Sequence, residues 1–181
     1  MLDELRLLAK AKTLDPEALT EIHNAYYGII FRYIIIRVSD HEIAQDLTSE
    51  VFLRLLTALR EKTAPQNTLK GWLFGVASRV ISDHHRKHYR SQQVELNEQL
   101  PAALDDPSET IDKALTWQNL EMAMGDLTNE QKEVIALRFG SELPIQQVAE
   151  MMGKSEGAVK QLQARAIATL SRKLSKFWHG S

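Results

Sequence analysis

The sequence predicts an all-α fold: two small helical domains joined by an acidic linker, the second containing a helix-turn-helix. Three observations support this prediction. Apolar residues recur at every third or fourth position, no segment alternates as a strand does, and eight glycines and five prolines are few for 181 residues. The predicted domains cover residues 1–92 and 112–181, the linker covers residues 93–111, and we expect the domains to be separable.

The first domain is predicted to hold three long helices. Asp15 provides an N-cap and Pro16 a suitable first residue for one that continues to about residue 38. The motif Ser39-Asp40-His41-Glu42 is interpreted as a capping box for the next helix. After a polar loop at residues 62–68, the third helix is expected over residues 69–90.

Charge is concentrated between the predicted domains. Residues 93–116 hold six acidic residues and one basic residue, whereas the flanking blocks are slightly basic and the whole chain has a net charge of −2. Pro101 and Pro107 interrupt the helical pattern in the same segment. These features indicate a linker.

In the second domain, helical periodicity resumes near Ile111. Thr128 and Gln131 form a capping box for a helix that is predicted to extend through Phe139, with Gly140 as its stop.

The clearest local pattern lies between residues 144 and 170. A short helix ends at Gly153, where a tight turn needs a positive φ, and Ser155 caps a second helix. Ala149 is the small residue expected where the two helices cross. This arrangement is typical of a helix-turn-helix, in which the second helix enters the major groove of DNA.

The outward face of that second helix is polar. Glutamine pairs well with adenine edges, and arginine and lysine pair with guanine or phosphate. The alternative is a plain helical hairpin with a solvated polar face. The residues proposed to face DNA are Ser155, Glu156, Lys160, Gln161, Gln163 and Arg165.

At this point the chain resembles the extracytoplasmic-function (ECF) sigma factors of bacterial RNA polymerase. Residues 127–139, 148–153 and 155–160 are similar to the family's fourth conserved region. Residues 46–55 and 71–86 are similar to its second conserved region. Both halves occur in the family's order with an acidic segment between them, and the resemblance covers about residues 16–91 and 112–176.

The resemblance implies a docking surface for the clamp helices of the polymerase largest subunit. Its matched positions are Asp46 and Glu50, with Phe52 and Arg54 beside them. A solvated helix face with Phe52 half-buried is the structural alternative.

The resemblance also implies a surface for the minus-10 promoter element. The loop at residues 62–68 corresponds to the loop that captures an unstacked base, and Gln66 and Asn67 offer hydrogen bonds to a base edge. On the third helix, one cationic face would follow phosphates: Arg79, Arg86, Lys87 and Arg90. The alternative for this face is solubilising charge.

The chain departs from the family pattern at several of these positions. Arg79 stands where the family often has asparagine, which favours phosphate contact over base recognition there. In the recognition helix, Leu162 and Ile167 replace arginines, so the minus-35 sequence is expected to differ from that of well-studied members. Pro144 replaces a capping serine.

The partners implied by the family are core RNA polymerase, through its clamp helices and flap region, promoter DNA and an anti-sigma factor. We expect a cytoplasmic location without membrane insertion, because no stretch of 18 apolar residues occurs. No cofactor and no catalysis are expected. The absence of cysteine excludes disulfides and thiolate metal sites.

Three other functions would each use part of this sequence pattern. A metal site at His84 and His88 lacks an obvious third ligand and the glutamate of a zinc peptidase motif. A response-regulator output protein would need a receiver domain with strands. A helical adaptor that binds only protein would not need the cationic face of the third helix.

Overall fold

A computed structural model of the chain describes residues 4–65, 68–94 and 119–178, and in these ranges every regular element is helical. The described part of the first half contains α1 (Glu4–Ala11), α2 (Pro16–Val38), α3 (His41–Arg60) and α4 (Leu69–Val94). In the second half, a helix of residues 119–125 is followed by α6 (Asn129–Ile135), the π-turn η1 (Ala136–Gly140), α7 (Ile145–Met152) and α8 (Glu156–Trp178). The all-α prediction is confirmed.

Local capping fixes several helix starts. The carboxylate of Asp15 accepts a hydrogen bond from the backbone N–H of Ala18, as predicted for the start of α2. Thr128 and Gln131 form the predicted reciprocal box at the start of α6. The capping box predicted to begin at Ser39 for α3 is wrong by one residue. Asp40 caps α3 through Ile43, whereas Ser39 ends α2 in the left-handed region, with φ 56°.

Two elements differ from the sequence prediction. Helix α1 was not predicted, and it packs Leu7, Leu8 and Ala11 against the first half. The helix predicted from residue 128 through Phe139 changes after Ile135 into the wider π-turn η1. The predicted linker and the predicted start of the next helix near Ile111 lie almost wholly in residues 95–118, outside the described residues.

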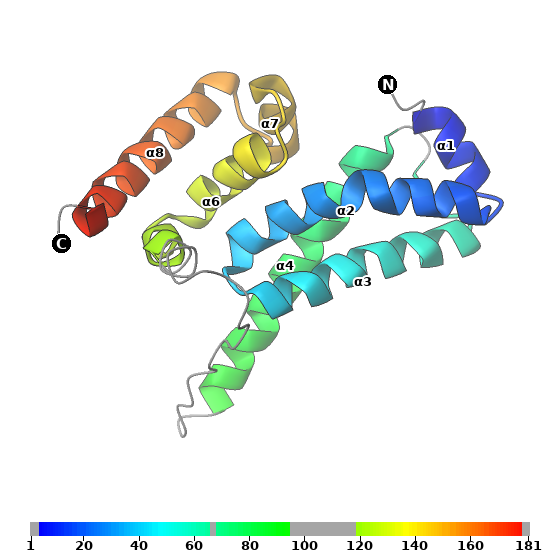
Figure 1. The fold of residues 1–181 in the computed structure, drawn as a ribbon, viewed down its shortest axis with the longest axis horizontal. Helices are drawn as coiled ribbons and strands as arrows, with labels where there is room; N and C mark the ends of the chain where they lie inside the picture. The colour runs from blue at the N-terminus through cyan, green and yellow to red at the C-terminus, as the bar shows by residue number, and fades with distance from the viewer. Residues whose placement is uncertain (1–3, 66–67, 95–118, 179–181) are drawn as a thin grey trace.

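The two halves share one hydrophobic core. Buried side chains of α2, α3 and α4, such as Tyr33, Ile34 and Phe74, belong to the same cluster as Val134 and Leu137 of the second half. Figure 1 shows α6, α7 and α8 gathered beyond one end of α2, while α1 lies at the other end. The sequence did not predict this direct contact, and the predicted separation of the domains remains a hypothesis about other states of the chain.

Candidate nucleic-acid interface

Helices α7 and α8 form the predicted helix-turn-helix. Gly153 adopts the left-handed conformation, with φ 62° and ψ 35°, which a glycine reaches without steric cost. The Ser155 hydroxyl then accepts a hydrogen bond from the N–H of Ala158, at 3.2 Å. Ala149 and Val159 are buried where the helices meet. The N-terminal half of α8 is therefore held by short-range chemistry in a fixed orientation.

The outward face of α8 is accessible. Ser155, Glu156, Lys160, Gln161 and Arg165 are all exposed. Polar and cationic side chains on a rigid, exposed helix are what recognition of the major groove requires.

Gln163 differs from its neighbours because it is half-buried and already engaged. Its side-chain oxygen accepts a hydrogen bond from Nε of Arg138 at 3.2 Å, and Arg138 also donates to the carbonyl of Leu143. Arg138 thus ties the π-turn and the segment before α7 to the recognition helix. Sequence reasoning missed this role, because nothing local relates Arg138 to Gln163.

The cationic face of α4 is exposed but contains an acid. Arg79, Arg86, Lys87 and Arg90 are exposed, and Arg79 donates from Nε to the carbonyl of Gly75 at 3.2 Å. Asp83 lies four residues after Arg79 and three before Arg86, so it shares their side of the helix. Its carboxylate pairs with Arg86 at 3.3 Å.

On α3, three of the four predicted docking residues carry charge. Asp46 is exposed, and Glu50 accepts hydrogen bonds from Nε and a terminal nitrogen of Arg54 at 3.0 and 2.5 Å. Arg54 also lies 3.6 Å from Asp83 of α4. The predicted polymerase surface on α3 and the predicted DNA surface on α4 are therefore connected through Arg54 and Asp83.

Phe52 belongs to a row of rings between α2 and α3. Its ring lies 5.0 Å from His23 and 6.1 Å from Tyr27, and Tyr27 stacks at 6.3 Å on Phe31. The side chain is half-buried, so it both packs and remains partly available. Leu53 beside it is 62% exposed, which adds an apolar contact area to the charged face.

The predicted base-capturing residues Gln66 and Asn67 lie outside the described residues. The chain on either side of them is anchored. Before them, the N–H of Thr63 donates to the carbonyl of Ala58 at 2.8 Å, and after them the N–H of Lys70 donates to the carboxylate of Glu4 at 2.7 Å. Helix α1 therefore caps the start of α4, a role that no local sequence pattern indicates.

The three histidines of α4 lie close together along one stretch of the helix. The rings of His84 and His88 stack at 6.2 Å, and no group of three or more metal-binding side chains occurs among the described residues. The pKa of His85 is lowered from its ordinary value, first because it loses water and then because His84, Arg37, Lys132 and His88 are near it. His85 thus faces cations of both halves of the molecule.

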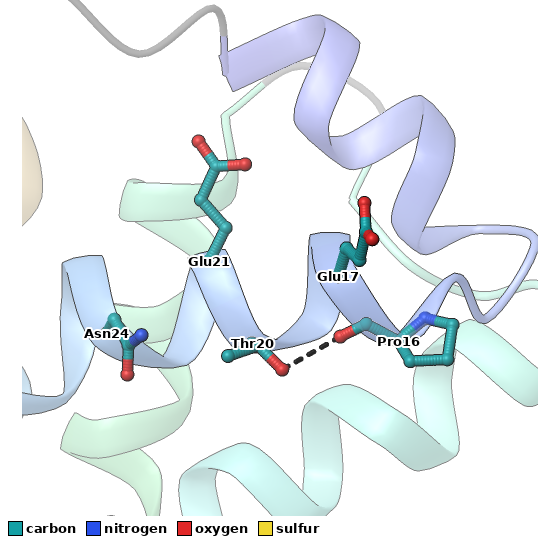
Figure 2. Close-up of a pocket in the computed structure, with 5 residues that line it drawn as sticks. All are labelled: Pro16, Glu17, Thr20, Glu21 and Asn24. Atoms are coloured by element: carbon teal, nitrogen blue, oxygen red, sulfur yellow. Dashed lines mark hydrogen bonds between the residues drawn. The ribbon is translucent and has the colours of Figure 1, made fainter.

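A hollow of 450 Å³ lies on the N-terminal part of α2. It is lined by Pro16, Glu17, Thr20, Glu21 and Asn24. Figure 2 shows the two carboxylates extending away from the helix without converging, while the Thr20 hydroxyl donates to the Pro16 carbonyl at 2.8 Å.

Both halves of the chain match models of known protein families. Residues 19–91 match the model described as Sigma-70 region 2, and residues 123–172 match Sigma-70, region 4. The ECF RNA polymerase sigma factor BldN of Streptomyces coelicolor is 33% identical over 172 residues, which are 94% of this chain. The chain belongs to the extracytoplasmic-function group of sigma factors. It spans 65% of the length of BldN.

Other matches cover nearly the whole chain of this sigma factor. RNA polymerase sigma factor YlaC of Bacillus subtilis is 24% identical over 163 residues, covering 88% of this chain and 94% of YlaC. The structure of RpoE with the anti-sigma factor NepR from Bartonella quintana has a TM-score of 0.67 at 21% identity, over 86% of this chain and 96% of that one. CnrH with the cytosolic domain of CnrY has a TM-score of 0.63 at 20% identity, over 95% and 97%. The last two establish likeness of fold.

The family assignment agrees with the location of the surfaces. The predicted docking residues and the cationic face lie within region 2, and the helix-turn-helix lies within region 4. Among the described ranges, no helix of this sigma factor is both long and apolar enough to cross a bilayer.

Proposed function

We propose that this sigma factor binds core RNA polymerase, directs it to specific promoters and promotes DNA opening, without catalysis of its own. The observation that carries the proposal is the pairing of regions 2 and 4 in one chain, with an exposed helix-turn-helix in the second. Sigma factors act as specificity subunits, so the chemistry of RNA synthesis belongs to the polymerase.

Region 2 is proposed to dock on the clamp helices of the largest subunit through α3. Asp46 and Glu50 supply negative charge, Arg54 orients Glu50, and half-buried Phe52 supports an apolar strip beside them. Charged rims steer an encounter while a central apolar contact supplies affinity. Region 4 is proposed to contact the flap region.

Promoter DNA is proposed to meet two surfaces. Arg79, Arg86, Lys87 and Arg90 would follow phosphates of the minus-10 element, with Gln66 and Asn67 holding an unstacked base. The outward residues of α8, from Ser155 to Arg165, would read the minus-35 duplex. Each surface carries few cations, so neither is expected to bind strongly alone. Joining them on one polymerase raises their effective concentration.

Control by an anti-sigma factor is also proposed, together with a cytoplasmic location. Support comes from the solved structure of RpoE, which is a complex with the anti-sigma factor NepR, and from that of CnrH, which holds the cytosolic domain of CnrY. These partners are properties of those proteins, and for this chain they suggest the class of regulator to look for.

Run-off transcription from a randomised promoter library tests the proposal. Sigma-free core polymerase with this protein should initiate from a distinct set of promoters, and core alone should not. Gel shifts with and without core separate the rival functions. A conventional regulator would bind duplex DNA equally well in both, and a protein-only adaptor would bind in neither.

Two double variants test the surfaces in the same assay. Asp46→Arg with Glu50→Arg should abolish core binding, because it reverses the charge that faces the clamp, with helicity unchanged. Lys160→Ala with Arg165→Ala should leave core binding intact and weaken minus-35 binding about tenfold or more, at one to three kcal/mol per specific contact. Glu17→Arg with Glu21→Arg is the matched charge-reversal control away from both surfaces, and normal activity of both test pairs would refute the assignments.

A further inference from the structure

One side chain of α1, Glu4, fixes the place where α4 begins. Its carboxylate accepts a hydrogen bond from the backbone N–H of Lys70 at 2.7 Å, although the two residues are 66 positions apart. Lys70 is the second residue of α4, so this N–H is one of the donors at a helix start that have no partner within the helix. A negative charge at that end also interacts favourably with the helix dipole.

Glu4 lies close to α2 as well. Burial raises the pKa of the Tyr26 hydroxyl on α2, and the negative charge of Glu4 raises it further. The carboxylate is therefore located where α1, α2 and the start of α4 meet. Figure 1 shows α1 at the same end of α2 as the first turn of α4.

Helix α1 does not need this hydrogen bond to stay in place. It ends four residues before Pro16 opens α2, so it folds back directly onto the first half. Its apolar face belongs to the same core as the buried side chains of α2 and α4, through Leu7, Leu8 and Ala11. Since these contacts already hold α1, the specific effect of Glu4 is at the start of α4.

The segment between α3 and α4 is held at its other end too. The N–H of Thr63 donates to the carbonyl of Ala58 at 2.8 Å, and the Ala64 side chain is buried. On the far side, Leu69 is completely buried just before the residue that Glu4 binds. The loop at residues 62–68 therefore starts and ends at fixed points, one on α3 and one that α1 determines.

The family resemblance gives α1 no role. The match to Sigma-70 region 2 begins at residue 19, after α1 has ended. The contact of Glu4 with Lys70 thus joins an element outside the matched residues to the turn of α4 that follows the proposed base-capturing loop.

We propose that Glu4 is a positioning residue for promoter opening: by holding the start of α4, it keeps the loop at residues 62–68 ready to receive an unstacked base of the minus-10 element. This inference rests on the base-capturing role proposed above for that loop. A loop that is ordered before DNA arrives loses less conformational entropy on binding, so it holds the base more tightly. Glu4 acts through the backbone of Lys70 and touches no DNA itself.

Single-stranded minus-10 DNA bound to the holoenzyme separates base capture from the other contacts. The strand is taken from a promoter found by run-off transcription, and it is compared with a series in which each base in turn is replaced by an abasic site. Fluorescence anisotropy gives the affinity of each strand. For the parent holoenzyme, we expect the abasic site at the captured position to weaken binding.

Glu4→Ala should weaken binding of the complete strand about fivefold, the effect expected when a helix cap is removed. Binding of the strand that is abasic at the captured position should not change, because that strand has no base for the loop to hold. Glu4→Gln keeps a side-chain oxygen as acceptor and should retain most of the parent affinity. Hydrogen exchange of the Lys70 amide should be faster in Glu4→Ala than in the parent.

Glu17→Ala is the matched control. It removes an exposed carboxylate from the first turn of α2, away from the start of α4, and it should bind both strands as the parent does. Because both strands are measured with the same holoenzyme, a smaller folded fraction in any variant would affect them equally.

Three results would overturn the inference: equal weakening of both strands by Glu4→Ala, full affinity of Glu4→Ala for the complete strand, or an unchanged exchange rate at Lys70. The first would mean a general effect on the fold, and the last would mean that Glu4 does not hold α4. A parent holoenzyme that no abasic site weakens would refute the proposed base capture itself, and the inference with it.

Discussion

At the scale of single residues, the contact between the halves is sensitive to charge. Glu133 is the carboxylate that balances Arg37, while Lys132 beside it has a pKa lowered by burial and then by Arg37. Removing one member of a buried pair leaves an uncompensated charge and costs more than the pair itself contributes. Substitution of Arg37 or Glu133 should therefore weaken the packing of the two halves.

His85 should make this contact dependent on pH. Its pKa is lowered in the folded chain by burial, and then by His84, Arg37, Lys132 and His88, which face it from α4, α2 and α6. Above the ordinary value of 6.5 both states are neutral and pH has no effect. As pH falls below 6.5 the unfolded form takes up the proton first, so the folded form loses stability.

We therefore predict that the free energy of unfolding of the free protein, measured by urea denaturation, falls as the pH is lowered from about 7.5 to about 5.5, around the ordinary histidine pKa. His85→Gln, which cannot be protonated, should flatten the profile over this window. A parent profile that is already flat, or a His85→Gln profile as steep as the parent's, would contradict the prediction.

At the scale of elements, α4 carries on one face both cations that attract DNA and a carboxylate that repels it. Asp83 pairs with Arg86 at 3.3 Å and lies 3.6 Å from Arg54 of α3. Because these side chains are largely exposed, the pairs contribute little to stability. Their effect is on the electrostatic potential that DNA meets at this face, because the Asp83 carboxylate cancels part of the positive charge of a short row of cations.

Asp83→Asn should accordingly strengthen holoenzyme binding to minus-10 DNA about two- to threefold and steepen the dependence of that binding on salt. Fluorescence anisotropy with a fork-junction DNA at several salt concentrations measures both quantities. Glu61→Gln, at the exposed end of α3, controls for the loss of any one negative charge. Equal or weaker binding by Asp83→Asn than by this control would disprove the effect.

Local chemistry made several elements predictable from the sequence. The caps at Asp15, Thr128 and Ser155 and the turn at Gly153 depend on neighbours within four residues, and all four were confirmed. Ser39 was assigned wrongly because two capping residues stand side by side, and only the backbone conformation shows that Asp40 is the cap.

Contacts across long stretches of sequence could not be predicted in this way. Gly140 ends η1, as predicted, but its small size also serves the approach of α2, and that depends on Ile36 more than a hundred residues earlier. The hydrogen bond between Arg138 and Gln163 and the capping of α4 by Glu4 also join residues that are far apart in the sequence. Local patterns could not predict either of them. Assignments of site residues to polymerase or DNA rest on the family pattern, and they remain predictions.

At the scale of the whole molecule, the shared core couples the stability of the two halves. A cluster that includes Tyr33, Phe74, Val134 and Leu137 loses contacts on both sides when either half unfolds. Chains with separate domains usually show more than one unfolding transition, whereas a single packed unit shows one.

Calorimetry of the free protein should therefore give one transition, with calorimetric and van't Hoff enthalpies that agree. Gly140→Leu should split it into two, or lower it while making the two enthalpies differ. Two resolved transitions in the parent protein would show that the halves unfold independently despite their contact.

The close approach at Gly140 also limits how such proteins can be recombined. Chimaeras that join region 2 of one relative to region 4 of another are an obvious way to engineer new promoter preferences. Here a donor segment with any larger residue at position 140 would collide with Ile36 and the backbone of Arg32. The resulting hybrid would carry both recognition surfaces but pack its two halves poorly, so lower stability is expected unless the glycine is transferred together with its α2 partner.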